Sequence, residues 1–348
     1  MSKNLALSAT KNPRVIDYMD EIIAFVKDLV DKGFAYEANG DVYFRVAKSK
    51  NYAKLANKTL EDLEVGASGR VDGEGNIKEN PLDFALWKAA KLGEVSWKSP
   101  WGQGRPGWHI ECSVMATSIL GDTIDIHGGG ADLEFPHHTN EIAQSEAKTG
   151  KTFANYWMHN GFVNVDNEKM SKSLGNFVTV HDMLKTVDGQ VLRFFLATQQ
   201  YRKPINFTEK AVHDASVNLK YLKNTFTLPL GKAVDAAELA KFKADFEAAM
   251  DDDFNTANGI TVAFDMAKWI NSGNYDQVTK DTFAKMLAVF GIVFEEEVLD
   301  ADIEALIEKR QEARANRDFA TADAIRDQLA AQGIKLLDTK DGVRWTCD

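Results

Sequence analysis

The chain has 348 residues, of which 44% are hydrophobic and 27% are charged, a composition typical of a globular protein with two or more domains. No apolar run resembles a signal peptide or a membrane span, and two cysteines exclude a disulfide framework, so we expect a cytoplasmic protein. The net charge of −11 argues weakly against a nucleic-acid partner but leaves room for a local basic face.

The first elements predicted along the chain are a helix and a hairpin. Apolar residues at helical spacing predict a helix over residues 15–34, and Gly33 is its predicted C-terminal stop. The Asn39-Gly40 pair between two β-prone runs predicts a tight hairpin. Residues 47–107 are rich in Gly, Lys, Asn and Pro, and we interpret them as an irregular insertion with short strands.

A change of pattern at residue 108 predicts part of a parallel α/β sheet. The pattern indicates a helix over residues 110–120 and a buried strand over residues 123–132 that runs into a glycine turn. Pro136 is expected to open the next helix. Helix, strand, turn and helix in this order are typical of half of a parallel α/β sheet.

The rest of the chain is predicted to be mainly helical. Helical patterns cover residues 178–200 and 208–225, and the Ala-, Lys-, Asp- and Glu-rich sequence that follows predicts a helical bundle. A charged helix pair is expected over residues 302–330. The chain then ends in a predicted small hairpin around Asp341-Gly342.

Two segments carry side chains that bind metal ions. Within the helix predicted after Pro136, His137 and Glu141 stand four residues apart and therefore on one face. Cys112 offers a thiolate from the preceding helix, and zinc accepts Cys, His and Glu together. The spacing also fits a second interpretation, in which the cysteine is a small core residue and the His–Glu pair lies on the surface.

Three further histidines lie near these segments. His109 is interpreted as structural, and His127 as a residue that ends a strand. His138 follows His137 directly, so it is expected on a different helical face. The predicted ligand set leaves these three residues out.

The glycine turn after the predicted strand is a candidate ligand site. Residues 128–130 are all glycines, which allow a ligand to approach the backbone closely. Asp132 follows just past the strand, where open α/β sheets bind ligands. A tight strand-to-helix connection explains the same residues without any ligand.

Residues 169–173 read Lys-Met-Ser-Lys-Ser and form a predicted flexible cationic loop. Lys169 and Lys172 are mobile point charges that can follow the charge developing on a nucleotide triphosphate as pyrophosphate leaves. A surface loop of random Lys and Ser residues is the alternative. The position of the segment, after the α/β half and before the helices, favours the functional interpretation.

Together these motifs resemble the cysteine–tRNA ligase family of class I aminoacyl-tRNA synthetases. The resemblance covers roughly residues 11–348, through the segments GDVYF, NPLDFALWK, SPWGQGRPGWHIECS, DIHGGGADLEFPHHTNE, NYWMHNGFV, EKMSKSLGN, MDDDFNT and RDFATADAIRDQL. It implies one Zn²⁺ per chain, ATP with Mg²⁺ as substrate, and two steps. Cysteine and ATP form cysteinyl-adenylate, and the cysteinyl group then moves to the tRNA for cysteine. The resemblance further implies that zinc selects cysteine over serine by bonding to its sulfur.

The resemblance also implies roles for individual residues of the amino-acid site. Cys112, His137 and Glu141 match three of the family's four zinc ligands. Trp108 and Asp132 match residues that line the cysteine pocket.

The implied ATP contacts lie in the glycine turn and in the Lys-Met-Ser-Lys-Ser segment. Lys169 and Lys172 match catalytic positions of the family's second signature. Gly130, Ser171 and Lys172 are the implied ATP-binding residues.

The implied fold class is α/β: an incomplete Rossmann-type parallel sheet with an inserted domain, then a helical bundle and a small C-terminal α+β domain. The implied domains are a remnant of the first Rossmann half (1–23), a connective insertion (24–107), the second Rossmann half with the zinc site (108–150), a stem-contact fold with the KMSKS loop (151–212), the helical bundle (213–300) and an anticodon-recognising domain (301–348).

The sequence departs from the family pattern before Cys112. The family's first signature, His-x-Gly-His, and its fourth zinc ligand, a cysteine before that signature, do not occur here. We therefore expect a truncated gene product, a gene model with a wrong start, or one half of a split enzyme whose other half is a separate chain. As given, the chain is expected to be a monomer with an open edge strand, loosely held zinc and negligible adenylation.

Two other functions fit parts of the sequence. One is the ligase that joins cysteine to an amino sugar in thiol biosynthesis, which shares the zinc site but is expected to lack a full anticodon-recognising tail. The other is a non-catalytic fragment that holds tRNA through its helical and C-terminal domains. The charged tail of residues 302–348 favours the tRNA enzyme over the first of these.

Overall fold

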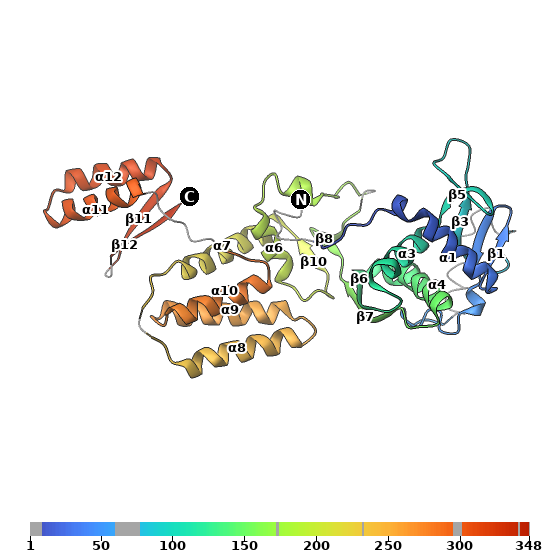
Figure 1. Ribbon diagram of the computed structural model, residues 1–348. Helices are drawn as coiled ribbons and strands as arrows, with labels where there is room; N and C mark the ends of the chain where they lie inside the picture. Colours follow the sequence, from blue (N-terminus) through green and yellow to red (C-terminus); the bar gives the residue numbers. More distant parts are fainter. Residues whose placement is uncertain are drawn as a thin grey trace. The chain divides into compact units, whose positions relative to one another are not determined.

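The computed structural model describes residues 9–59, 77–171, 174–231, 233–294, 301–339 and 342–347. The chain divides into two compact units, Met1–Val293 and Phe294–Asp348. Figure 1 labels the elements of both units. Among the sequence predictions, Lys172 lies outside the described residues.

The predicted first helix is confirmed. A 3₁₀ turn (Val15–Tyr18) leads into α1 (Met19–Asp31), which buries an apolar stripe that includes Ile22, Val26 and Leu29. Gly33 follows with a φ of 77°, the left-handed conformation that ends helices.

The predicted irregular insertion, residues 47–107, contributes three strands to an antiparallel sheet that also contains the preceding hairpin, in the order β1-β2-β3-β5-β4. Its strands are β1 (Ala35–Ala38), β2 (Asp41–Phe44), β3 (Phe84–Ala89), β4 (Trp97–Ser99) and β5 (Gly102–Pro106). The predicted hairpin joins β1 to β2, and Asn39 and Gly40 take φ values of 56° and 86°. Residues from α1, β2, β3 and α3 share one hydrophobic core, so this sheet supports the helix that carries Cys112.

The predicted half of a parallel sheet is confirmed, but its first strand is mostly not buried, and the three glycines at 128–130 form the end of that strand and not a turn. Along the chain come α3 (Trp108–Leu120), β6 (Ile124–Gly130), two short helical turns (Ala131–Leu133 and Glu134–His138), α4 (Thr139–Thr149) and β7 (Ala154–Asn160). β6 and β7 are parallel neighbours, in register from Ile124 opposite Ala154 to Gly130 opposite Asn160. In Figure 1 these two strands lie beside α3 and α4.

The start of the helix after the glycine turn differs from the prediction. The regular helix begins at Thr139, three residues after Pro136. The preceding turn is a wider π-type turn, and Phe135 within it has an extended backbone with φ −139° and ψ 130°. An extended residue interrupts helical hydrogen bonding, so His137 and His138 lie in the turn directly before α4.

The helical pattern predicted over residues 178–200 is interrupted. The structure has two short helices there, α5 (Val180–Met183) and α6 (Gly189–Ala197). The side chain of Asp188 accepts hydrogen bonds from the backbone N–H groups of Gln190 and Val191, which starts a new helix at that point.

A second small sheet, in the order β10-β8-β9, carries the start of the KMSKS segment. Its strands are β8 (Val163–Val165), β9 (Glu168–Lys169) and β10 (Ile205–Phe207). β8 pairs in parallel with β10 and antiparallel with β9.

The predicted helical bundle is confirmed as α7 (Glu209–Phe226), α8 (Ala236–Asp251), α9 (Thr256–Asn271) and α10 (Gln277–Val289). Each of these helices has an N-terminal side-chain cap, from Thr208, Asp235, Asn255 and Asp276 respectively. In the described part of the chain, no helix is both long and apolar enough to cross a membrane.

The second unit contains the predicted helix pair and hairpin. They are α11 (Ala301–Ala315), α12 (Phe319–Ala331), β11 (Ile334–Thr339) and β12 (Gly342–Cys347), and the two strands are antiparallel. Ile325, Leu329 and Ile334 form its small core. Buried Arg310 makes two hydrogen bonds of 2.9 Å with the carboxylate of Asp338, which ties α11 to β11.

Candidate metal centre

Three side chains from different elements converge where α3 meets the start of α4. Cys112 comes from the second turn of α3, His137 from the turn before α4, and Glu141 from the first turn of α4. One donor atom of each, a sulfur, a nitrogen and an oxygen, lies within 4.8 Å of the other two. The structure therefore brings together the three residues that the sequence proposed as metal ligands.

A second group of possible ligands shares the same carboxylate. His127 from β6 and His138 from the turn before α4 lie within 4.8 Å of Glu141 and of each other. His127 Nε2 is 3.0 Å from Glu141 Oε2, closer than His137 Nε2 at 3.8 Å or His138 Nε2 at 3.9 Å. The sequence prediction left out His127 as a residue that ends a strand and His138 as a residue on a different helical face. In the structure, His127 lies in the middle of β6 and His138 in a turn before α4, and both approach Glu141.

The histidines around Glu141 also contact one another. His109 Nδ1 lies 2.9 Å from His137 Nδ1, and His138 Nδ1 lies 2.7 Å from His159 Nε2 of β7. Burial lowers the pKa of His109 to about 4 and that of His138 to about 3, and it also lowers the pKa of His137 and His159. These imidazoles are therefore neutral at pH 7, the form that binds metals.

The carboxylate of Glu141 provides a test of whether these residues fit a metal ion. The side chain is fully buried, and its Oε1 has no hydrogen-bond partner within the described ranges. Burial, with the charges of Glu141 and Glu111, raises the pKa of Cys112 to about 12. A divalent cation would satisfy the unpaired oxygen and stabilise the thiolate, so the donor set fits zinc.

Of the two predicted cysteine-pocket residues, Trp108 precedes Cys112 in the sequence and Asp132 lies between Cys112 and His137. The ring of Trp108 is 4.4 Å from that of His137 between centroids, and the tryptophan side chain is 58% exposed. Asp132 is exposed in the turn after β6. Its Oδ1 bends over the backbone of Gly130, where an added Cβ would lie only 2.5 Å away. The structure thus places Trp108 at the metal candidates and Asp132 with Gly130 at the strand end.

The KMSKS segment belongs to the other sheet. Lys169 ends β9, and its Nζ lies 4.3 Å from the centroid of the Phe162 ring. Asn176 braces the segment because its Oδ1 accepts from the N–H of Ser171 at 2.9 Å and its Nδ2 donates to the carbonyl of Lys169 at 3.3 Å. The Ser171 hydroxyl accepts a further hydrogen bond from the N–H of Leu174 at 3.3 Å.

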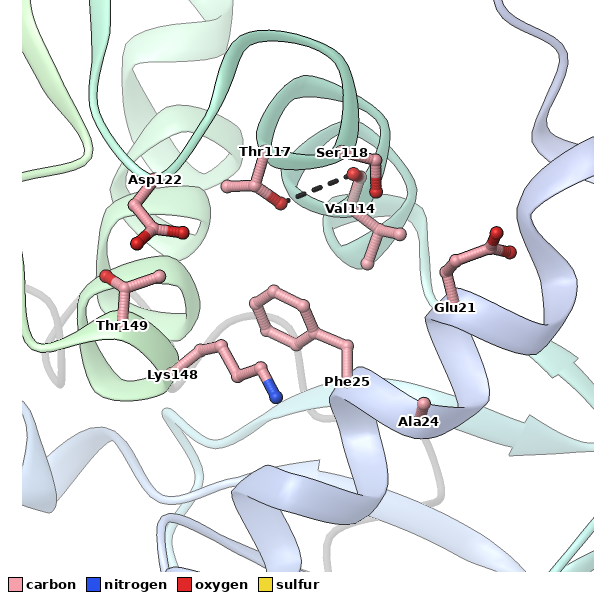
Figure 2. A pocket seen from close by; sticks show the side chains of 9 residues that line it. All are labelled: Glu21, Ala24, Phe25, Val114, Thr117, Ser118, Asp122, Lys148 and Thr149. Carbon is pink, nitrogen blue, oxygen red and sulfur yellow. Dashed lines mark hydrogen bonds between the residues drawn. The ribbon is translucent and has the colours of Figure 1, made fainter.

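A separate pocket of about 280 Å³ lies between α1, α3 and α4. Figure 2 shows Phe25 and Val114 on its walls, with Lys148 next to Phe25. Lys148 Nζ is 3.1 Å from Asp28, so its charge is already paired. None of the predicted site residues lines this pocket, and we assign it no function.

Comparison with solved structures shows the class of fold. A methionyl-tRNA synthetase of Mycobacterium tuberculosis in complex with methionyl-adenylate aligns with 83% of this chain and 73% of its own, with a TM-score of 0.52 and 13% identity. A putative arginyl-tRNA synthetase of Campylobacter jejuni aligns with 85% of this chain and 66% of its own, with a TM-score of 0.51 and 13% identity. The fold is that of class I aminoacyl-tRNA synthetases.

Sequence comparison gives the particular family. Residues 1–217 match the family described as tRNA synthetases class I (C) catalytic domain, residues 245–295 match the DALR domain, and residues 296–345 match the cysteinyl-tRNA ligase anticodon binding domain. The cysteine–tRNA ligase of Streptococcus agalactiae serotype V is 84% identical over 98% of this chain and 76% of its own length. Those of Streptococcus thermophilus and Streptococcus pyogenes serotype M6 are 83% and 82% identical over the same shares. The chain belongs to the cysteine–tRNA ligase family.

Family membership decides between the functions considered from the sequence. ATP-dependent attachment of cysteine to tRNA is the function that these relatives support. They do not favour the amino-sugar ligase or the non-catalytic tRNA-binding fragment.

Proposed function

We propose that this chain binds one zinc ion through Cys112, His137 and Glu141 and uses it to select cysteine for attachment to tRNA. The observation that supports the proposal is that one donor atom from each of these residues lies within 4.8 Å of the other two. The Glu141 carboxylate is buried, and one of its oxygens is unpaired among the described residues. Zinc bound there would supply a Lewis acid that prefers a thiolate to the neutral hydroxyl of serine. Size alone discriminates poorly between these two amino acids.

We assign the other contacts of the amino acid to Trp108 and Asp132. The exposed indole ring beside His137 can form an apolar wall of the pocket. The exposed carboxylate of Asp132 can accept hydrogen bonds from an ammonium group. These two contacts would hold the backbone of the amino acid while its sulfur faces the metal ligands.

For ATP with Mg²⁺, we propose Gly130, Ser171 and Lys172 as binding residues and Lys169 and Lys172 as catalytic ones. Gly130 ends β6 beside the Asp132 side chain, at the strand end where open α/β sheets bind ligands. Lys169 is exposed at the end of β9, and its ammonium can exchange its contact with the Phe162 ring for phosphate oxygens. The charge that develops as pyrophosphate leaves is the target of these lysines.

We propose that the domains follow the boundaries expected from the sequence, with tRNA for cysteine held by the stem-contact fold and by residues 301–348. The protein is proposed to act as a cytoplasmic monomer. Its acidic net charge requires that phosphate contacts come from local basic groups.

We also propose that β6 accepts a further strand, from the same polypeptide or from a separate chain. Among the described strands, β6 pairs only with β7. Ile126 and Tyr156 are directly opposed on these strands and are 53% and 70% exposed. Parallel sheets in globular proteins are normally covered on both faces, so this exposed apolar pair fits a contact surface.

Cobalt substitution tests the metal proposal. A Co²⁺-loaded chain is expected to bind one equivalent of metal and to show a sulfur-to-cobalt charge-transfer band. Cys112→Ser is expected to abolish the band, whereas Cys347→Ser, at the chain's other cysteine, is expected to retain it. A band that persists in Cys112→Ser, or binding well below one equivalent in the unmodified chain, would contradict the proposed ligand set.

A further inference from the structure

The loop between α8 and α9 contacts the segment that joins α6 to β10, residues 198–204, here called the joining segment. The carboxylate of Asp253 in that loop accepts hydrogen bonds from three consecutive residues of the joining segment. The donors are Gln200 Nε2 at 3.3 Å, the Tyr201 hydroxyl at 2.9 Å and Arg202 Nε at 2.6 Å. A second nitrogen of Arg202 lies 3.3 Å from the other carboxylate oxygen.

The backbone of this loop is unusual. Asp253 and Phe254 are adjacent non-glycine residues with φ values of 54° and 53°, a left-handed conformation that costs free energy in such residues. The hydroxyl of Thr256 donates to the carbonyl of Gln199 at 3.2 Å, so a second contact holds the loop to the joining segment. The hydrogen bonds of Asp253 and Thr256 therefore hold this strained loop against the joining segment.

On its other side, the joining segment lies against the start of β8. The N–H of Gly161 donates to the carbonyl of Tyr201 at 2.7 Å, and the N–H of Ile205 donates to the carbonyl of Phe162 at 2.9 Å. A Cβ on Gly161 would lie 2.5 Å from the backbone of Lys203, so the two backbones are in direct contact. The joining segment cannot shift without moving the start of β8.

β8 in turn holds the first residues of the KMSKS segment. Asn164 of β8 is opposite Lys169 of β9, and the N–H of Met170 donates to the carbonyl of Val163 at 3.3 Å. The contact of Lys169 Nζ with the Phe162 ring adds a side-chain link to the same strand. A continuous set of contacts therefore runs from Asp253 through the joining segment and β8 to Lys169.

We propose that Asp253 is a positioning residue that sets the backbone of the KMSKS segment for ATP. The proposal rests on the role assigned above to Lys169. The Arg202 and Asp253 side chains are 58% and 43% exposed, and ion pairs at such sites contribute little to stability. The exposed Asp253 carboxylate nevertheless accepts hydrogen bonds from three residues of the joining segment. This arrangement fits a residue that fixes the geometry of that segment better than one that stabilises the whole fold. The loop between α8 and α9 and Lys169 are then expected to move together.

Site-resolved amide hydrogen exchange tests this coupling directly. Asp253→Asn is expected to raise the exchange rates of the Gly161, Ile205 and Met170 amides roughly two- to fivefold, because a surface network is lost. Asp253→Glu, which keeps the negative charge, is expected to recover most of the protection. The matched control is Asp265→Asn, which removes an exposed ion pair of 2.9 Å with Lys268 on α9 and is expected to leave the three amides unchanged.

Two results would overturn the proposal. One is an increase confined to the joining segment, with the Met170 amide unchanged. The other is an increase that extends to the amides of α1, because that would indicate general unfolding. A binding arm measures the dissociation constants for ATP and for cysteine by isothermal titration. Asp253→Asn should weaken ATP binding and leave cysteine binding unchanged, and an equal loss of both, or no loss for ATP, would refute a specific effect on ATP. The exchange rates do not depend on activity, so they separate this proposal from a failure of the proposed ATP chemistry.

Discussion

The candidate metal centre and the KMSKS segment are assembled in opposite ways. The metal candidates come from separate elements and converge on a fully buried carboxylate. The KMSKS segment is contiguous in sequence, and its Lys169 is exposed and its backbone braced by Asn176. Buried polar groups depend strongly on each partner, whereas exposed ones can exchange partners with water. Single replacements should therefore have much larger effects at the metal centre.

The largest effect is expected from Glu141→Gln. The replacement keeps the shape of the side chain but removes the buried charge, so zinc affinity should fall by at least about 100-fold. Replacing a residue that only hydrogen-bonds to a metal ligand typically lowers metal affinity by about 10- to 100-fold. Competition with a chromophoric chelator measures this affinity. Glu146→Gln on the same helix is the control, because Glu146 accepts a backbone N–H from Phe153, which glutamine can also do.

Thermal unfolding adds a second measurement on the same variant. Zinc should raise the Tm of the unmodified chain but not that of Glu141→Gln, since only bound metal stabilises the folded state by mass action. Unchanged zinc affinity in Glu141→Gln would remove the carboxylate from the ligand set.

The next effect is a dependence of zinc affinity on pH. In the metal-free protein the pKa of Cys112 is raised to about 12, so the thiol is protonated at pH 7 and must release a proton to bind metal. Because the metal-bound state holds one proton fewer, affinity should rise about tenfold for each unit of increasing pH near pH 7. His109 and His138 have low pKa values and are already neutral near pH 7, so they release no further protons when zinc binds.

Isothermal titration in two buffers of different ionisation enthalpy counts the protons released. The expected value is about one per zinc bound near pH 7. In Cys112→Ser the proton release should disappear together with most of the affinity. A pH-independent affinity in the unmodified chain would show that the thiol is not a ligand.

The smallest effect is expected from Asn176→Ala in the KMSKS segment. Loss of one part-buried and one exposed hydrogen bond should raise the exchange rate of the Ser171 amide by roughly fivefold and leave zinc affinity unchanged. Asn274→Ala is the control, because Asn274 also donates from an amide to a backbone carbonyl, that of Trp269 in the bundle. A change in zinc affinity in Asn176→Ala would mean that the two regions are more tightly coupled than the contrast above implies.

Local patterns were sufficient to predict many of the elements. The stripe of Ile22, Val26 and Leu29 predicted α1, and the Asn39-Gly40 pair predicted the β1–β2 hairpin, because helical periodicity and left-handed turns are local properties. Local patterns did not show where capping divides a helical segment, as at Asp188, which starts α6 within residues 178–200.

The sequence by itself predicted the first candidate ligand set, because Cys112, His137 and Glu141 are chemically distinctive and two of them stand four residues apart. Whether these residues bind a metal stays a prediction. Only the tertiary structure decided which other groups surround Glu141. His127 approaches it from the middle of β6, and His138 from the turn that begins at Glu134. Burial then kept the His138 imidazole neutral and left Glu141 Oε1 unpaired, because loss of water depends on every element packed around a group and not on its neighbours in sequence.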